Sequence, residues 1–132
     1  MDLINLKPTS DTVEVTLNHP NTGDALLNDD GTPMVIVLHA NHSKEYKKIL
    51  HEQTNKRIKA MQGGKKSEIT AQDIEEASLT QLSKATASWD ITYGGEKPKL
   101  SITKAKEIYD EVFWIRDQLE GALAESLDFT KA

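Results

Sequence analysis

The chain has 132 residues and a formal net charge of −5, with 37% apolar and 28% charged residues, and a chain of this length fits one domain with one core. It has no cysteine, which excludes disulfides, thiolate nucleophiles and cysteine metal sites. No apolar run approaches the ~20 residues of a membrane helix. The N-terminus does not have the pattern of a signal peptide, so we expect a protein of the cytosol.

Charge is distributed unevenly along the chain. Residues 1–43 hold one basic and six acidic residues, and residues 44–66 hold eight basic and two acidic ones. Residues 67–132 hold seven basic and thirteen acidic ones. A basic segment between two acidic segments can dock on its own flanks, on a second copy of the chain, or on an acidic partner.

Two strands are predicted in the first third of the chain. In residues 12–18, Val13, Val15 and Leu17 alternate with polar residues, which is the period of a half-buried strand. Residues 34–39 form a second strand that is apolar on both faces, and turn-forming clusters lie between the two strands. Because sequential strands usually pair, we expect an antiparallel hairpin that needs helices on one face.

A helical spacing of apolar residues begins after residue 43. Asn41 or Ser43 can cap this first helix, which we expect to stop at the glycines 63–64. This helix holds most of the basic segment.

A second helix is predicted from a variant of the capping box, Thr70 with Asp73, and we expect it to run to about Ser88. A short extended piece over 89–93 and a turn follow.

Ser101 is placed to cap a third helix, which is either long or broken. These elements predict an α+β fold, mainly helical, in which an N-terminal antiparallel β-hairpin packs on three helices. We expect a single domain over 1–132, with the hairpin in 12–40 and the helical part in 43–129.

No group of residues fits a known catalytic or metal-binding pattern. His39 and His42 are three residues apart, whereas zinc motifs pair histidines four apart with a Glu, or use pairs of Cys. The Gly-Gly-Lys-Lys-Ser segment at 63–67 lacks the first Gly of a phosphate-binding loop and follows a helix rather than a strand. We therefore predict a non-enzymatic protein with no catalytic residue, no metal and no cofactor.

Aromatic residues gather at the C-terminal end, which indicates a binding surface there. Four of the seven aromatic residues lie in the last helix and tail: Tyr109, Phe113, Trp114 and Phe129. On a continuous helix Trp114 would project among charged residues, and exposed Trp side chains are common anchors of interfaces. A helix break near Phe113 and Trp114 would instead bury the Trp, and both readings stay open.

The basic segment supplies the second candidate surface, with Lys47, Lys48 and Arg57 as its partner-binding residues. An alternative use of residues 44–66 is the binding of nucleic-acid phosphates. The acidic remainder of the chain, the single Arg in the segment and the single interleaved aromatic, Tyr46, disfavour this alternative.

The order of these features resembles the tail assembly chaperones of bacteriophages with long, non-contractile tails. The resemblance spans roughly residues 12–129. It rests on the N-terminal hairpin, the basic helix, the Ser-capped last helix and short sequence echoes: SKEYKK (43–48), SWDIT (88–92), GEKP (95–98), IY (108–109), FWI (113–115) and LDF (127–129).

The resemblance implies a small cytoplasmic protein of the bacterial host cell that binds the tape-measure protein before the tail tube polymerises. Such chaperones keep the tape measure soluble and are absent from the finished virion. In many of them a ribosomal frameshift yields an extended form that contacts the tail-tube protein, and this chain would match the shorter form. The resemblance also implies self-association around the client and no active site.

Overall fold

The computed structural model describes residues 2–3, 11–62 and 70–125 of the chain. Within these residues the fold has a three-stranded antiparallel sheet and four helices, so the predicted α+β, mainly helical class is confirmed. The strands are β1 (Thr12–Thr16), β2 (Val35–His39) and β3 (Thr86–Asp90), and the helices are α1 (Lys44–Gln62), α2 (Ala71–Ala85), α3 (Ile102–Glu111) and α4 (Trp114–Ala124).

The predicted hairpin is present, because β1 pairs antiparallel with β2. The sheet order is β1-β2-β3, so β2 is the central strand. Ile36 and Leu38 of β2 are 0% exposed on the face that the helices cover, while Val35 and Val37 on the other face are half-buried. This central position explains why the sequence of β2 is apolar on both faces.

The short extended piece predicted over 89–93 overlaps the third strand only at Trp89 and Asp90, because the strand begins at Thr86, and the expectation that α2 runs to about Ser88 is wrong. α2 ends at Ala85, and Thr86 already has the extended backbone of a strand, with φ −74° and ψ 116°. Thr86 pairs with Leu38 across the sheet. Pairing with the free edge of β2 satisfies backbone groups that a continued helix would leave to water, and a β-branched Thr suits a strand.

The predicted helix starts are confirmed. Ser43 Oγ accepts a hydrogen bond from the Tyr46 backbone N–H at 3.1 Å. Thr70 and Asp73 form a complete capping box, and Ser101 caps α3 through the Lys104 N–H. The predicted helix stop at 63–64 lies outside the described residues.

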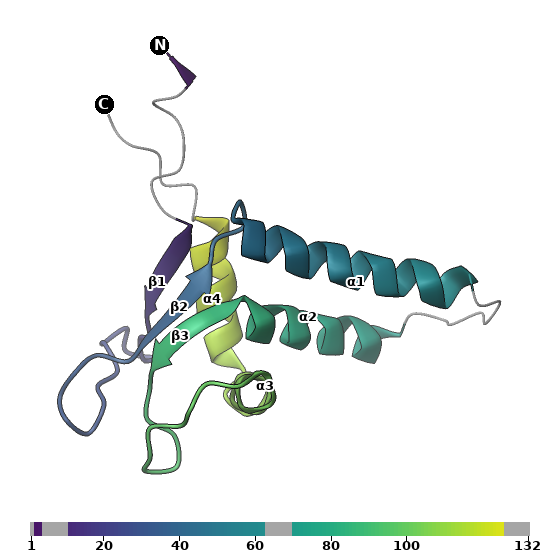
Figure 1. Ribbon diagram of the computed structural model, residues 1–132. Coiled ribbons are helices and arrows are strands. Elements are labelled where there is room, and N and C mark those ends of the chain that lie inside the picture. The colour runs from purple at the N-terminus through teal and green to yellow at the C-terminus, as the bar shows by residue number, and fades with distance from the viewer. Residues whose placement is uncertain (1, 4–10, 63–69, 126–132) are drawn as a thin grey trace.

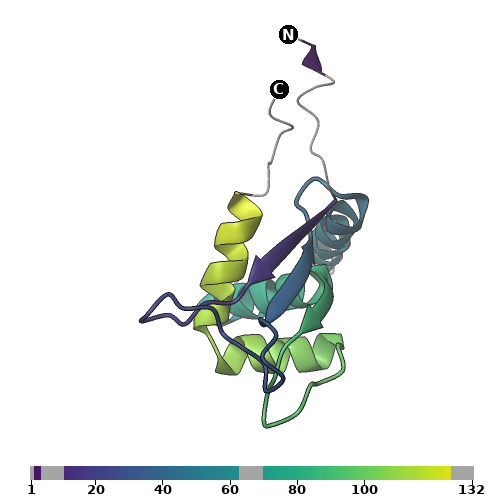
Figure 2. The ribbon, with the colours of Figure 1, turned by 90° about the vertical axis from the view of Figure 1, so that its left-hand side faces the viewer.

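The helices have two arrangements relative to the sheet. In Figure 1, α1 and α2 lie side by side and extend away from the sheet. Figure 2 shows α4 standing beside β1 and α3 running below the strands. The core therefore lies between the sheet, the helices α2, α3 and α4, and the N-terminal half of α1, and the distal parts of α1 and α2 project from it.

Tyr109 lies in the centre of this core and is 0% exposed. Its hydroxyl is 2.7 Å from Thr86 Oγ1, and Thr86 Oγ1 donates its own proton to the Leu82 carbonyl, so Tyr109 is the donor of the pair. The edge of the Trp89 ring meets the Tyr109 ring at 83°, with 6.3 Å between centroids. Burial raises the pKa of Tyr109 to about 12.

We expect the free energy of unfolding to fall as pH rises from about 10 towards about 12. The folded pKa lies above the ordinary value of 10.0, so the Tyr109 contribution is complete below pH 10 and lost above it. The loss amounts to roughly 2–3 kcal/mol. Urea unfolding across this pH range checks it. Tyr109→Phe should remove this pH-dependent loss, whereas Tyr93→Phe should keep it; an unchanged alkaline loss in Tyr109→Phe would contradict the expectation.

Candidate partner-binding surfaces

The basic helix α1 is anchored only in its N-terminal half. Tyr46 and Ile49 are buried in the core, and Gln53 Nε2 donates to the Ala77 carbonyl of α2 at 3.1 Å. The side chains described beyond this point, residues 54–59, are all exposed. The second half of α1 therefore presents most of its circumference to solvent.

The predicted partner-binding cations Lys47, Lys48 and Arg57 are all exposed on α1. Within residues 11–62 and 70–125, no Lys or Arg of α1 forms a salt bridge. The ion pair that α1 makes there uses its Glu52, whose carboxylate lies 3.9 Å from Lys84 Nζ. The positive charge of α1 is thus left without an internal partner in the described part of the chain.

Acidic residues of α2 are paired with cations of the last two helices instead. Glu75 Oε1 lies 3.4 Å from Arg116 Nη1 of α4, and Glu76 forms an ion pair with Lys106 of α3. Among the described residues, the cations of α1 therefore do not pair with the acidic segments of the same chain. A second copy of the chain and an acidic partner are the two docking partners that remain for them.

Exposed apolar side chains accompany these cations. Leu50 is 38%, Ile58 47% and Ile74 58% exposed. They lie on what we call the helical arm, residues 50–62 of α1 with residues 71–80 of α2. A groove of about 350 Å³ separates the two helices of the arm. The lining of this groove is mostly polar and charged, and Leu50, Ile58 and Ile74 lie outside it. Exposed apolar side chains mixed with unpaired charges are typical of a protein-binding surface.

The last predicted helix is broken, and the continuous-helix reading of Trp114 is wrong. α3 ends at Glu111, Val112 leaves the helical conformation with φ −102° and ψ 67°, and α4 begins at Trp114. Trp114 is half-buried and packs against the core, while Phe113 is 64% exposed. The break resets the helical phase, so the side chain that projects into solvent is Phe113 rather than Trp114.

The other two predicted aromatic contacts do not belong to this surface. Tyr109 is in the core and does not reach the surface of the domain, so the prediction that it contacts a partner is wrong. Its position follows from helical spacing, because Ala105, Ile108 and Tyr109 form the buried face of α3. Phe129 lies outside the described residues.

An apolar cavity of about 170 Å³ opens beside the break. Leu26 and Met34 of the β1–β2 connection form one wall, Tyr93 another, and Val112 and Trp114 a third. These segments are far apart in sequence. The break thus places an exposed aromatic ring next to an apolar cavity.

A polar network fixes two walls of this cavity. Asn28, which is 3% exposed, donates from Nδ2 to the Asp90 carbonyl at 3.3 Å and accepts at Oδ1 from Thr92 Oγ1 at 2.7 Å. It thereby ties the loop that carries Leu26 to the segment after β3 that carries Tyr93. A buried Asn whose amide is bonded at both ends holds such loops in one arrangement.

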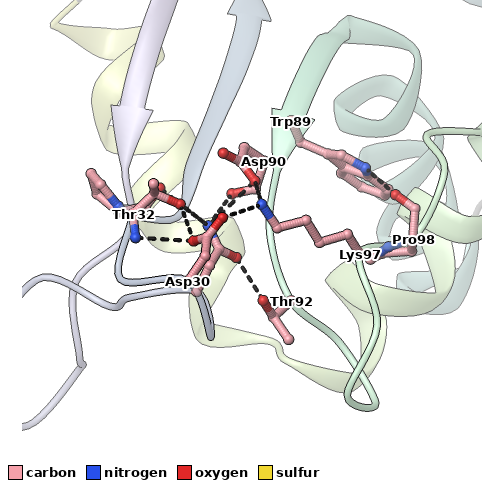
Figure 3. Close-up of polar contacts among 9 residues, drawn as sticks. Asp30, Thr32, Trp89, Asp90, Thr92, Lys97 and Pro98 are labelled. Atoms are coloured by element: carbon pink, nitrogen blue, oxygen red, sulfur yellow. Dashed lines mark hydrogen bonds and ion pairs between the residues drawn. The ribbon is translucent and has the colours of Figure 1, made fainter.

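Lys97 closes the same network on its solvent side. Its Nζ lies 3.0 Å from Asp30 Oδ2 and 3.1 Å from Asp90 Oδ1, and Figure 3 shows the ammonium group between the two carboxylates. Hydrogen bonds from Thr32, and then from Lys97, hold the pKa of Asp30 below its ordinary value. No sequence pattern predicts this cluster, because its residues come from the β1–β2 connection, the end of β3 and the turn after it, which only the fold brings together.

In the described part of the chain, no three His, Cys, Asp or Glu side chains are grouped so that they could hold a metal ion. No helix among the described residues has the length and apolarity to cross a membrane.

Comparison with known proteins adds no relative: the chain matches no known protein family, no curated protein and no solved structure.

Truncating the two aromatic residues of the break should have different effects on stability. Trp114→Ala removes a half-buried ring and should lower the free energy of unfolding by about 2–3 kcal/mol. Phe113→Ala removes an exposed ring and should change it by no more than about 0.5 kcal/mol. Urea unfolding followed by circular dichroism measures both; equal losses in the two variants would contradict the placement of these side chains.

Proposed function

We propose that this chain is a tail assembly chaperone of a bacteriophage with a long, non-contractile tail, and that it binds the tape-measure protein before the tail tube polymerises. The observation that carries the proposal is the open helical arm. Its cations Lys56 and Arg57 have no ion pair among the described residues, and the exposed apolar side chains Leu50 and Ile58 lie on the same helix. The order of sequence features over 12–129 supports the choice of family.

The arm suits a long helical client such as a tape-measure protein. A client helix that lies along the groove between α1 and α2 would meet Ala77, the stem of Arg57 and the charged groups of Lys56 and Arg57. Acidic residues on the flank of that helix would then face the cations of α1. This mode explains why the arm keeps its positive charge open while Glu75 and Glu76 are neutralised elsewhere.

The remaining parts of the proposal follow the family. The chaperone acts in the cytoplasm of the bacterial host and is absent from the mature virion. Copies self-associate around the client, and an extended form made by frameshifting recruits the tail-tube protein.

Co-expression with a tape-measure fragment tests the proposal. We expect the fragment to stay soluble and to co-purify with the chain, because the arm covers its apolar surface. A fragment that stays insoluble and unbound in the presence of the chain would reject the function.

A charge variant tests the use of the arm. Lys56→Gln with Arg57→Gln, two cations that line its groove, should weaken binding of the fragment about 2- to 30-fold, as expected for two exposed ion pairs. The matched control is Lys99→Glu, which changes the net charge by the same amount at an exposed site off the arm and should leave binding unchanged. Equal weakening by both would show that only net charge matters. Calorimetric titration gives the affinities.

The open cations of α1 also support a second candidate, a small nucleic-acid-binding accessory protein that uses residues 44–66. Two observations disfavour it. Glu45 and Glu52 lie among the cations of α1 and would repel phosphate groups. Leu50 and Ile58 expose apolar surface on the same helix, and a phosphate backbone has no apolar group to contact it.

A gel shift with duplex DNA and with RNA at ~50 mM salt separates the two candidates, because phosphate contacts bind tightly at low salt and weaken steeply as salt rises. We expect no shift. A shift that is lost in Lys47→Gln with Lys48→Gln but kept in Lys99→Glu would favour the nucleic-acid function instead.

A further inference from the structure

The cavity beside the break between α3 and α4 has the size and lining for one aromatic ring. Its volume is about 170 Å³, and Leu26, Met34 and Ile115 are among its apolar walls. A buried cavity of ~150 Å³ lined by Leu, Ile and Phe binds benzene in another protein. A phenyl group that enters this cavity therefore finds matching volume and no polar group that it would leave without a partner.

The domain itself presents such a ring directly beside the opening. Phe113 is the most exposed of the described aromatic side chains, with 64% of its surface open to solvent. Its backbone is held in a hydrogen-bonded turn, because the Ile115 N–H donates to the Val112 carbonyl at 3.0 Å and the Arg116 N–H to the Phe113 carbonyl at 3.2 Å. The exposed ring is thus carried by a short ordered turn rather than by a free loop.

We propose that the Phe113 ring of one copy occupies this cavity in a second copy, and that the contact is reciprocal. Val112 and Trp114, the chain neighbours of Phe113, both line the cavity, so the projecting ring and the cavity lie side by side on one surface. A two-fold contact requires this arrangement, since each copy offers the same patch and both halves form together. The Trp114 ring then forms part of the wall against which the partner ring packs.

Charges around the break make the affinity of this dimer depend on salt. Asp110, Glu111 and Asp117 are exposed next to the break. Arg116 is engaged with Glu75 of α2. Two copies that meet here bring their acidic groups together, and salt screens that repulsion. The dimer therefore strengthens as salt rises, whereas binding of an acidic client by α1 weakens.

Sedimentation equilibrium of the full chain across a range of concentration and salt tests the proposal. We expect a monomer–dimer equilibrium for the wild type, a dissociation constant at least ~10-fold higher in Phe113→Ala, and a tighter dimer at high salt. Ile74→Ala is the matched control, because Ile74 is 58% exposed on the arm and should leave the dimer unchanged. A wild type that is monomeric up to ~1 mM, or a Phe113→Ala variant that dimerises like the wild type, overturns the proposal.

Benzene serves as a probe of the cavity itself. In monomeric Phe113→Ala, added benzene should shift the NMR signals of the Ile115 methyl groups and the Trp114 indole, and in the wild type it should dissociate the dimer. Absence of these shifts, or a dimer that benzene leaves intact, means that no ring enters the cavity and also overturns the proposal.

This dimer deepens the self-association that the proposed function includes, but it does not depend on binding of the tape measure. Phe113→Ala should still bind a tape-measure fragment, because the arm lies elsewhere on the domain. A dimer that behaves as described while the wild type fails to bind the fragment would reject the chaperone function and leave this inference standing.

Discussion

The fold depends on the pair of hydroxyl groups that joins Thr86 to Tyr109. Thr86 is the residue at which α2 becomes β3: it donates back to the Leu82 carbonyl of the helix and pairs with Leu38 in the sheet. Tyr109 brings α3 to the same point and donates its phenol proton to Thr86. The helical layer and the sheet are therefore joined at one buried, fully satisfied polar contact, which low polarity around it strengthens.

Local chemistry explains which parts of the fold the sequence could predict. The helix starts at Ser43, Thr70 and Ser101 were predictable, because capping depends on residues within one turn of each other. The alternation in 12–18 was likewise sufficient for β1. The start of the third strand was not predictable from its own residues, because Thr86 to Ser88 adopt strand geometry through pairing with β2, a contact across about fifty residues of sequence.

The candidate site shows the same division. Exposure of Lys47, Lys48 and Arg57 followed from helical spacing, and so did the concentration of positive charge on one helix. The sequence could not say which acids these cations face, since ion pairs between helices depend on tertiary packing. The structure assigns Glu75 and Glu76 to cations of α4 and α3. The cavity was not predictable from the sequence, because its walls come from the β1–β2 connection, the turn after β3 and the α3–α4 break, which are far apart along the chain.

The shallow anchoring of α1 has a consequence for cooperativity. Only the first half of the helix is fixed by Tyr46, Ile49 and Gln53, and a helical segment of its remaining length is marginal in water without tertiary contacts. Such a segment opens in sub-global steps well below the free energy that unfolds the sheet. A ligand that binds the folded helix shifts this local equilibrium towards the folded form by mass action. The distal turns of α1 are therefore more ordered when the surface is occupied than when it is free.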